Sequence, residues 1–212
     1  MSLGVLSGLR ELLVVAPHPD DEVIGCAGLI QHVQDAGGRA TVVVMSDGAA
    51  SHPGSKQYPP ERLRAARRRE SLRALAHIGV GEDRVHFMNH PDGGSERWSG
   101  FGALEAVLAQ PFDLVALPSG YDNHGDHRAT RAICAARTDA DVLHYLVWPD
   151  ESGRRPPAPE LSLDISPYRV RKAEALLHYA TQLGSIRDSE HGFAIDQPLF
   201  QRFTAPVEHF HA

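Results

Sequence analysis

A run of titratable side chains interrupts the hydrophobic stretch VVAPHPDDEVIGCAG at residues 14–28. The run extends from His18 to Glu22 and directly follows an apolar segment that ends at Pro17. Imidazoles and carboxylates bind divalent cations and transfer protons. Consecutive residues of a helix point about 100° apart, so Asp20 and Asp21 cannot both face one metal easily. We expect one of them to ligate while the other addresses a water beside it.

A second cluster lies much later in the chain, in LPSGYDNHGDHRAT at residues 117–130. It contains two histidines and a carboxylate, His124, Asp126 and His127. Two imidazoles and one carboxylate, with a position left open for water, form a common catalytic zinc set. His18 and Asp21, three residues apart across the start of a helix, can also converge on one ion. The two clusters together predict a metal site.

The elements around these clusters favour an α/β fold. Short β-rich runs alternate with helical patterns, which predicts β-α-β crossovers and a mainly parallel sheet with helices on both faces. Such sheets bind ligands beyond the carboxyl ends of their strands, and each cluster follows a predicted strand. The predicted strands are 12–16, 40–45, 84–88, 113–117, 142–147 and 161–164, and the predicted helices are 22–36, 61–77, 101–109, 127–136 and 167–183.

The turn after the first strand does not suit a dinucleotide. Residues 25–28 read GCAG, which is not the G-x-G-x-x-G pattern. Asp20, Asp21 and Glu22 fill the turn that would hold a pyrophosphate, and their charges would repel it. Pro19 suits the first helical position, which would place the acids in the first turn, where the helix dipole favours them. Helix capping alone needs one acid and does not account for a histidine.

The composition predicts one compact domain over residues 1–212. The chain is 42% hydrophobic and carries a formal net charge of −6, so it is a poor candidate for binding nucleic acid or an anionic membrane. The arginine-dense stretch at residues 62–73 is the exception, and we interpret it as a solvated helix face.

Several features point to the cytoplasm. No apolar run reaches the roughly 18 residues of a membrane-spanning helix. Residues 1–8 are too few for a signal peptide and lack a basic start. Cys26 and Cys134 are far apart in the sequence and form no C-x-x-C motif, as expected for a reduced setting.

The two clusters resemble the motifs of the PIG-L/LmbE-like family of metal-dependent N-acetylglucosaminyl deacetylases. The A-H-P-D-D-E motif corresponds to residues 16–22, where Pro17 departs from the usual residue, and the H-x-D-H motif corresponds to residues 124–127. The resemblance implies a Rossmann-like fold. Weaker matches extend it over nearly the whole chain: MSDG from Met45, R-x-x-E from Arg67, PDGG from Pro91, DIS from Asp164 and HYATQ from His178.

The resemblance implies a role for each residue of the first motif. His18 and Asp21, together with His127, would hold the metal, which is expected to be Zn²⁺, with Fe²⁺ suited to the same ligands. Asp20 would be the general base on the water that the metal activates.

The resemblance also implies roles for the remaining site residues. His124 would be a protonated histidine that stabilises the oxyanion or supplies a proton to the leaving amine. Asp126 would orient His124 and favour its charged form. Arg67 and Asp92 match positions that contact sugar hydroxyls, although a surface arginine and a turn aspartate are the simpler interpretations.

The leading hypothesis is therefore removal of an N-acetyl group from a GlcNAc-type sugar within a larger small molecule. A metal-dependent hydrolase of another bond, such as a phosphoester, is an alternative, but such enzymes usually need more carboxylates and a bridging ligand. A second alternative is a non-catalytic metal-binding or sugar-binding module. The presence of both Asp20 and His124 argues against it, because binding alone requires neither. We expect specificity to vary in the loops at residues 49–60 and 149–159, and self-association is common in the family.

Overall fold

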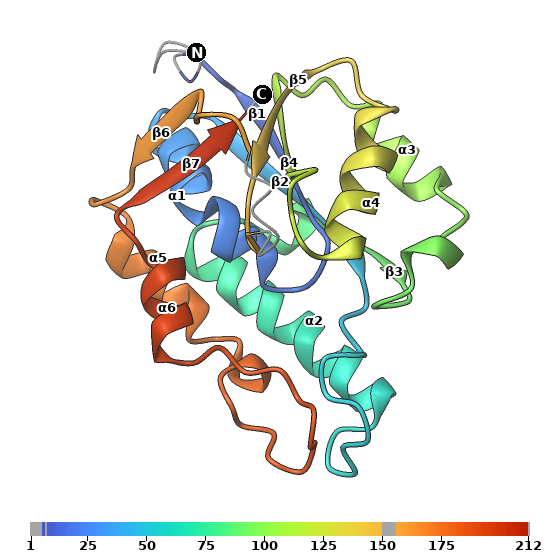
Figure 1. Cartoon of the computed structure of the whole chain (residues 1–212). Coiled ribbons are helices and arrows are strands. Elements are labelled where there is room, and N and C mark those ends of the chain that lie inside the picture. The colour runs from blue at the N-terminus through green and yellow to red at the C-terminus, as the bar shows by residue number, and fades with distance from the viewer. Residues whose placement is uncertain (1–5, 7, 150–155, 212) are drawn as a thin grey trace.

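The computed structural model describes residue 6, residues 8–149 and residues 156–211, so most of the predicted loop at 149–159 lies outside the described part. Within the described part, one seven-stranded sheet has the strand order β3-β2-β1-β4-β5-β7-β6 (Figure 1). The strands are β1 (Glu11–Ala16), β2 (Arg39–Ser46), β3 (Val85–His90), β4 (Leu114–Pro118), β5 (Asp141–Tyr145), β6 (Leu161–Asp164) and β7 (Val207–His211). The α-helices are α1 (Asp21–Asp35), α2 (Pro60–His77), α3 (Gly102–Leu108), α4 (Gly125–Ala135), α5 (Arg169–Leu176) and α6 (Gln197–Phe203).

The first five strands are parallel, and β7 is antiparallel to both β5 and β6. In the register of the central strands, Val14 of β1 lies between Val42 of β2 and Ala116 of β4. All three are fully buried, because a parallel sheet is covered on both faces, and this is why these strands read as continuous apolar runs.

Helices cover both faces of the sheet. Successive residues of a strand point to opposite faces, and Leu12 and Val14 pack with α1, α2 and α5 while Leu13 and Val15 pack with α3 and α4. Figure 1 shows α3 and α4 on one side of the sheet and α1, α2, α5 and α6 on the other. The predicted Rossmann-like arrangement, a mainly parallel sheet between two helical layers, is confirmed.

The glycines of α1 serve close packing. A Cβ atom at Gly25 would lie 2.3 Å from the ring of Tyr145, and one at Gly28 would lie 2.1 Å from Ile165. Both distances are well inside van der Waals contact, so only glycine lets the helix lie this close to β5 and to the residue after β6. The GCAG stretch is thereby explained without a phosphate ligand.

The C-terminal part differs from the prediction. The predicted helix at 167–183 is wrong in its length, because α5 ends at Leu176 and only a single 3-10 turn follows at Ala180–Gln182. Helix α6 and strand β7 were not predicted. Strand β7 places the charged Glu208 in the interior, where its carboxylate accepts hydrogen bonds from the backbone N–H groups of α1 and pairs with Lys172. A buried ion pair hides the apolar alternation by which strands are recognised.

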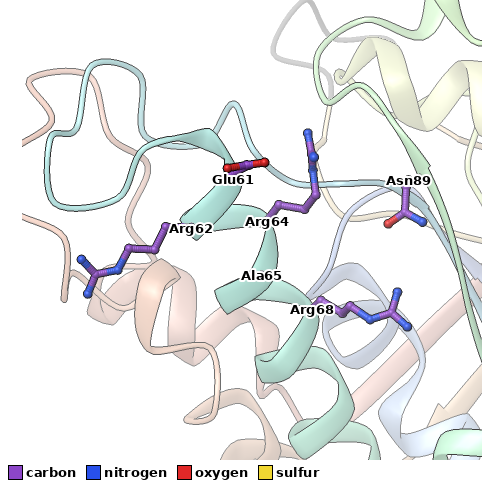
Figure 2. A pocket seen from close by; sticks show the side chains of 6 residues that line it. All are labelled: Glu61, Arg62, Arg64, Ala65, Arg68 and Asn89. Carbon is purple, nitrogen blue, oxygen red and sulfur yellow. The ribbon is translucent and has the colours of Figure 1, made fainter.

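The arginine-rich face of α2 is occupied by contacts within the chain. The guanidinium of Arg62 lies over the ring of Tyr58, Arg68 lies over Phe87, and Arg64 pairs with Asp47. Figure 2 shows these arginines along a shallow hollow on the outer side of the helix. Arg62, Arg64 and Arg68 remain exposed, which supports the interpretation of a solvated helix face, whereas Arg67 of the same stretch is buried.

Two further expectations can be compared with the described residues. Cys26 and Cys134 are both buried and unpaired there. Among the described residues, no helix has the length and hydropathy that a membrane span requires.

The buried position of His144 is expected to make the stability of the protein sensitive to acid. It lies on β5 opposite His211 of β7 and is only 8% exposed. Burial, the charge of Arg131 and the proximity of His211 lower the pKa of His144 to about 4, although a hydrogen bond at the backbone of Pro118 raises it. The native state therefore binds fewer protons than the unfolded chain between this value and about 6.5, the ordinary pKa of histidine.

We therefore expect the free energy of unfolding to fall as the pH drops from about 6.5 to 4. Because one pKa unit corresponds to about 1.4 kcal/mol, we expect His144 to account for roughly 2 to 3 kcal/mol of this loss. Urea unfolding at a series of pH values should show a flatter dependence in His144→Gln, and the exposed His191→Gln serves as the control. An unchanged slope in His144→Gln would assign the acid sensitivity to another group.

Candidate metal centre and active site

The two predicted clusters meet because β1 and β4 are adjacent strands. From β1 the chain adds β2 and β3 on one side of the sheet, and from β4 it adds β5 on the other side. Each cluster follows the carboxyl end of one strand of this pair. This is the crevice in which open α/β sheets bind ligands. Both clusters therefore lie at the edge of the sheet where the alternation of strands and helices predicts a ligand site.

The helix starts differ from the prediction by a few residues. Pro19 is not the first helical residue, because Asp20 is the N-cap of α1 and Asp21 begins the helix. Helix α4 begins at Gly125, earlier than expected, so that His124 is its N-cap and His127 lies in its first turn. Both motifs therefore lie at helix starts, with Asp21 and His127 in the first turns of α1 and α4.

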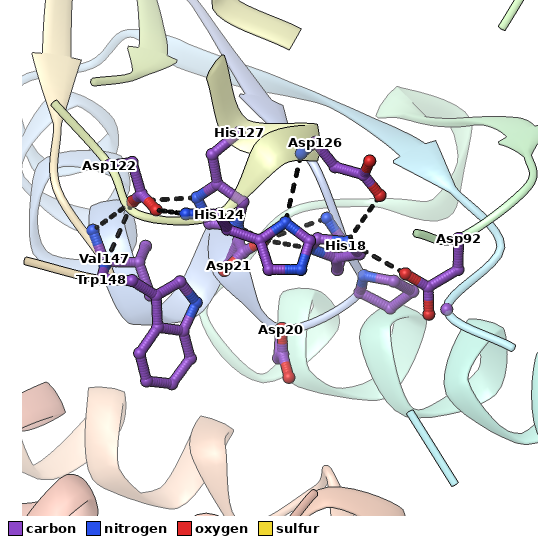
Figure 3. Close-up of polar contacts among 12 residues, drawn as sticks. His18, Asp20, Asp21, Asp92, Asp122, His124, Asp126, His127, Val147 and Trp148 are labelled. Atoms are coloured by element: carbon purple, nitrogen blue, oxygen red, sulfur yellow. Dashed lines mark hydrogen bonds and ion pairs between the residues drawn. The ribbon is translucent and has the colours of Figure 1, made fainter. Parts of the chain in front are cut away.

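Asp21 lies between two histidines that are far apart in the sequence. Its Oδ2 atom is 3.1 Å from Nδ1 of His18 and 3.1 Å from Nε2 of His127. His124 joins the same cluster, since it offers a ring nitrogen that lies within 4.8 Å of ring nitrogens of His18 and His127. Figure 3 shows the three imidazoles gathered around Asp21. The predicted ligands His18, Asp21 and His127 are thus brought together.

Asp122 positions His127 and was not predicted. It is fully buried, and its Oδ2 lies 3.0 Å from Nδ1 of His127 and accepts backbone N–H groups from Val147 and Trp148. Its other oxygen accepts the backbone N–H of His124. A carboxylate only accepts hydrogen bonds, so Nδ1 of His127 carries a proton and Nε2 faces Asp21. The sequence signal was available, since such an acid often supports a metal-binding histidine.

The carboxylate of Asp126 contacts His18, which corrects the expectation that it orients His124. Its Oδ2 is 3.3 Å from Nε2 of His18 and accepts the backbone N–H of Gly93. Asp92 contacts the same ring nitrogen at 3.1 Å. Asp126 meets His124 only through its backbone N–H, which donates to Nδ1 of that ring. His18 is therefore the imidazole that these two carboxylates orient.

The carboxylates favour the protonated form of two of the imidazoles. Burial lowers the pKa of His127, but the charge of Asp21 and the hydrogen bond to Asp122 outweigh it and raise the value to about 9. Burial opposes protonation of His18 as well, yet its hydrogen bonds to Asp126, Asp21 and Asp92 hold its pKa well above the usual range. A bound divalent cation would replace these protons.

His124 behaves differently from its two neighbours. Burial lowers its pKa, the charges of His18 and His127 lower it further, and the charges of Asp126 and Asp21 only partly compensate. Asp126 thus favours the charged form of His124, as expected, but does not dominate. If a metal replaces the protons on His18 and His127, the charge of the ion takes the place of theirs and acts on the pKa of His124.

Asp20 stands apart from the histidine network, as Figure 3 shows. Its backbone has a φ of 132°, a strained value for a residue with a Cβ atom, and Glu22 holds its N–H at 2.9 Å. Its carboxylate accepts a hydrogen bond from Arg67 at 3.1 Å. Burial and the charges of Asp21 and Glu22 raise the pKa of Asp20 to about 8, against the lowering effect of Arg67 and His18.

A cavity of about 620 Å³ opens above these residues. Asp20, His124, Arg67 and Asp92 all line it, together with residues that were not predicted as site residues: Ser51, Asn123, Trp148, Gln182 of the HYATQ motif, Phe193, Leu199 and Arg202. The guanidinium of Arg67 is 3% exposed and also donates to the backbone oxygen of Gly48, so it contacts Asp20 rather than projecting freely into the cavity. The size is typical of a pocket for a small organic molecule.

Comparison with known proteins identifies relatives of this chain. The family profile described as "PIG-L: GlcNAc-PI de-N-acetylase" matches residues 13–138. A 1D-myo-inositol 2-acetamido-2-deoxy-alpha-D-glucopyranoside deacetylase of Kineococcus radiotolerans is 32% identical over 117 residues, which are 54% of this chain. The match spans about a third (32%) of the length of that relative.

Solved structures share the fold. The N,N'-diacetylchitobiose deacetylase of Pyrococcus horikoshii superimposes with a TM-score of 0.75 over 98% of this chain and 85% of its own, at 19% identity. GalB, the 4-carboxy-2-hydroxymuconate hydratase of Pseudomonas putida KT2440, has a TM-score of 0.69 over 92% and 83% of the two chains, at 20% identity. Because a deacetylase and a hydratase share this fold, the fold does not determine the reaction.

Proposed function

Because this chain belongs to the PIG-L family of GlcNAc-PI de-N-acetylases, we propose that it is a metal-dependent hydrolase of a GlcNAc-type substrate. It would remove the N-acetyl group from the sugar of a larger small molecule. The observation that carries the proposal is the carboxylate of Asp21 between the facing nitrogens of His18 and His127, beside a cavity that His18, Asp20 and Asp21 line.

The donor set suits a zinc ion. Two imidazoles and a carboxylate are a usual catalytic set for Zn²⁺ and also suit Fe²⁺. The Nε2 atom of His127 lies 3.1 Å from the Asp21 carboxylate, and among the described residues no group forms a well-directed hydrogen bond with it, so a cation can displace its proton and bind there. We propose His18, Asp21 and His127 as the ligands. A bound divalent ion would polarise the acetyl carbonyl and lower the pKa of a water molecule to near 7.

Asp20 and His124 divide the proton transfers between them. Asp20 takes a proton from the attacking water, whose oxygen forms a bond to the carbonyl carbon of the acetamide. His124 stabilises the negative charge that develops on the carbonyl oxygen. The C–N bond then breaks with its electron pair on nitrogen, and the protonated ring of His124 donates a proton to that nitrogen. Acetic acid and the amine leave, and the proton on Asp20 passes through water to restore the charged form of His124.

Arg67 has a further effect on Asp20. Its charge lowers the pKa of a carboxyl group that burial raises, so it keeps a larger fraction of Asp20 in the basic form at neutral pH. We propose that this is the main role of Arg67. Asp92 would support His18 through the Nε2 atom of that ring. Its carboxylate also lines the cavity, where a sugar hydroxyl can donate to it.

Release of acetate tests the proposal. The protein, loaded with Zn²⁺ or Fe²⁺, should release acetate from N-acetylated amino sugars, and prior removal of the metal by a chelator should abolish the release. Restoring the ion should restore turnover, which separates metal dependence from damage. A phosphoester substrate in the same assay serves as the comparison. Turnover of the phosphoester without any acetate release would replace this proposal with the alternative hydrolase.

A further inference from the structure

The cavity has an apolar wall that the proposed chemistry does not use. Trp148 follows β5, Phe193 lies in the loop before α6, and Leu199 and Arg202 belong to α6. All four lie beyond residues 13–138, the segment that matches the family profile. The reacting groups are therefore in the shared segment, and this wall, hereafter the C-terminal wall, is in the part that the profile does not cover.

The C-terminal wall is held in place from several directions. The ring of Trp148 meets Phe193 edge to face at a centroid distance of 5.7 Å and Phe203 at 5.6 Å. Asp122 holds the backbone N–H of Trp148 at 3.1 Å. Arg202 lies 5.4 Å from the centroid of the Trp148 ring and donates to the backbone oxygen of Val147. A platform fixed in this way can receive a planar group without reorganising.

Polar residues line the cavity next to this wall, since the backbone N–H of Phe193 donates to the backbone oxygen of Ser51 and that of Asn123 donates to Trp148. Gln182 is 1% exposed and, among the described residues, its Oε1 has no hydrogen-bond partner. Ser51 and Asn123 also line this cavity and add hydroxyl and amide groups. These polar groups suit the hydroxyls of a sugar. The C-terminal wall, in contrast, offers few partners for hydroxyl groups, and a buried hydroxyl without a partner weakens binding.

We infer that the C-terminal wall binds the part of the substrate beyond the sugar, and that this part is an aromatic ring with an acidic substituent. The inference rests on the proposed function. A flat ring packs well against Trp148, Phe193 and Leu199. Arg202 is exposed at the end of this apolar surface, and its remaining N–H groups can donate to a carboxylate in a paired geometry. A polyol such as inositol, or a second sugar, would fit this wall less well.

Three glycosides of N-acetylglucosamine test the inference, each prepared as both anomers. One carries a 4-carboxyphenyl group, the second a 4-carbamoylphenyl group of the same shape without the charge, and the third an inositol. Calorimetry on the metal-loaded protein measures affinity, and acetate release measures kcat/KM. We expect the carboxyphenyl compound to bind about tenfold more tightly than the carbamoylphenyl compound, the usual size of a charged hydrogen bond, and the inositol compound to bind most weakly.

Two variants assign the effect to residues. Arg202→Gln should reduce the tenfold preference for the carboxylate to about onefold to twofold. The control is Arg187→Gln, an exposed arginine before α6 that does not line the cavity, and it should retain the preference. Trp148→Phe should weaken both aromatic compounds more than free N-acetylglucosamine. Thermal midpoints of all variants show whether the fold is intact.

The outcomes distinguish this inference from the proposed function. Equal affinity for the charged and neutral aromatic compounds, or tighter binding of the inositol compound, overturns the inference even if acetate is released. A carboxylate preference that depends on Arg202, without acetate release from any compound, supports the subsite and overturns the proposed function. Absence of both binding and release contradicts both.

Discussion

Asp20→Asn should retain its metal and lose kcat by roughly 10²- to 10⁴-fold, the usual contribution of a general base. Asp20 forms no hydrogen bond or ion pair with the imidazoles drawn in Figure 3, and its carboxylate accepts a hydrogen bond from Arg67 instead. Asparagine keeps the shape and an acceptor oxygen but cannot take a proton from water. It also tolerates positive φ better than most residues, so the strained backbone at this position is little disturbed.

Steady-state kinetics of acetate release and metal analysis on the same sample measure both parts of this prediction. Asp83→Asn, an exposed aspartate remote from the cavity, is the matched control. Near-normal turnover of Asp20→Asn would remove Asp20 from the role of base. Loss of metal would instead mean that Asp20 is a ligand and that the roles of Asp20 and Asp21 are exchanged.

The second large effect concerns the metal. His127→Ala should lose the ion altogether, whereas Asp122→Asn should bind it about 10- to 100-fold more weakly, the usual cost of losing the carboxylate behind a metal-binding histidine. The difference is expected because His127 is the proposed ligand and would supply the donor atom, while Asp122 holds the protonated Nδ1 of that ring at 3.0 Å. An asparagine retains one acceptor, so the ring keeps part of its support.

Competition with a chelator of known affinity measures these losses, and thermal unfolding of the metal-free proteins tests whether the fold survives. Because the carboxylates raise the pKa of His18 and His127, protons compete with the ion, and the affinity of the unaltered protein should fall as the pH is lowered. Full metal content in both His127→Ala and His18→Ala would place the site elsewhere.

The predicted elements that agree with the structure are those with a strong local pattern. The strand predicted at 12–16 is observed at Glu11–Ala16, and the helix predicted at 61–77 is observed at Pro60–His77. The short helix α6 and the strand β7 lack such a pattern. Helix α6 has seven residues, too few for a clear 3.6-residue period, and β7 carries Glu208 in its interior.

The sequence by itself determined the class of fold and the location of the site. Apolar runs separated by helical patterns predict parallel strands. The residues after β1 and β4 are histidines and aspartates, the types that bind metals. Both features can be read from residues that are neighbours in the chain. Tertiary structure alone decided which groups touch. It placed Asp126 on His18 instead of His124, set Asp122 behind His127, and brought Trp148 and Arg202 to the cavity. These contacts join segments whose approach depends on strand order and on the direction of each side chain, neither of which a local pattern encodes.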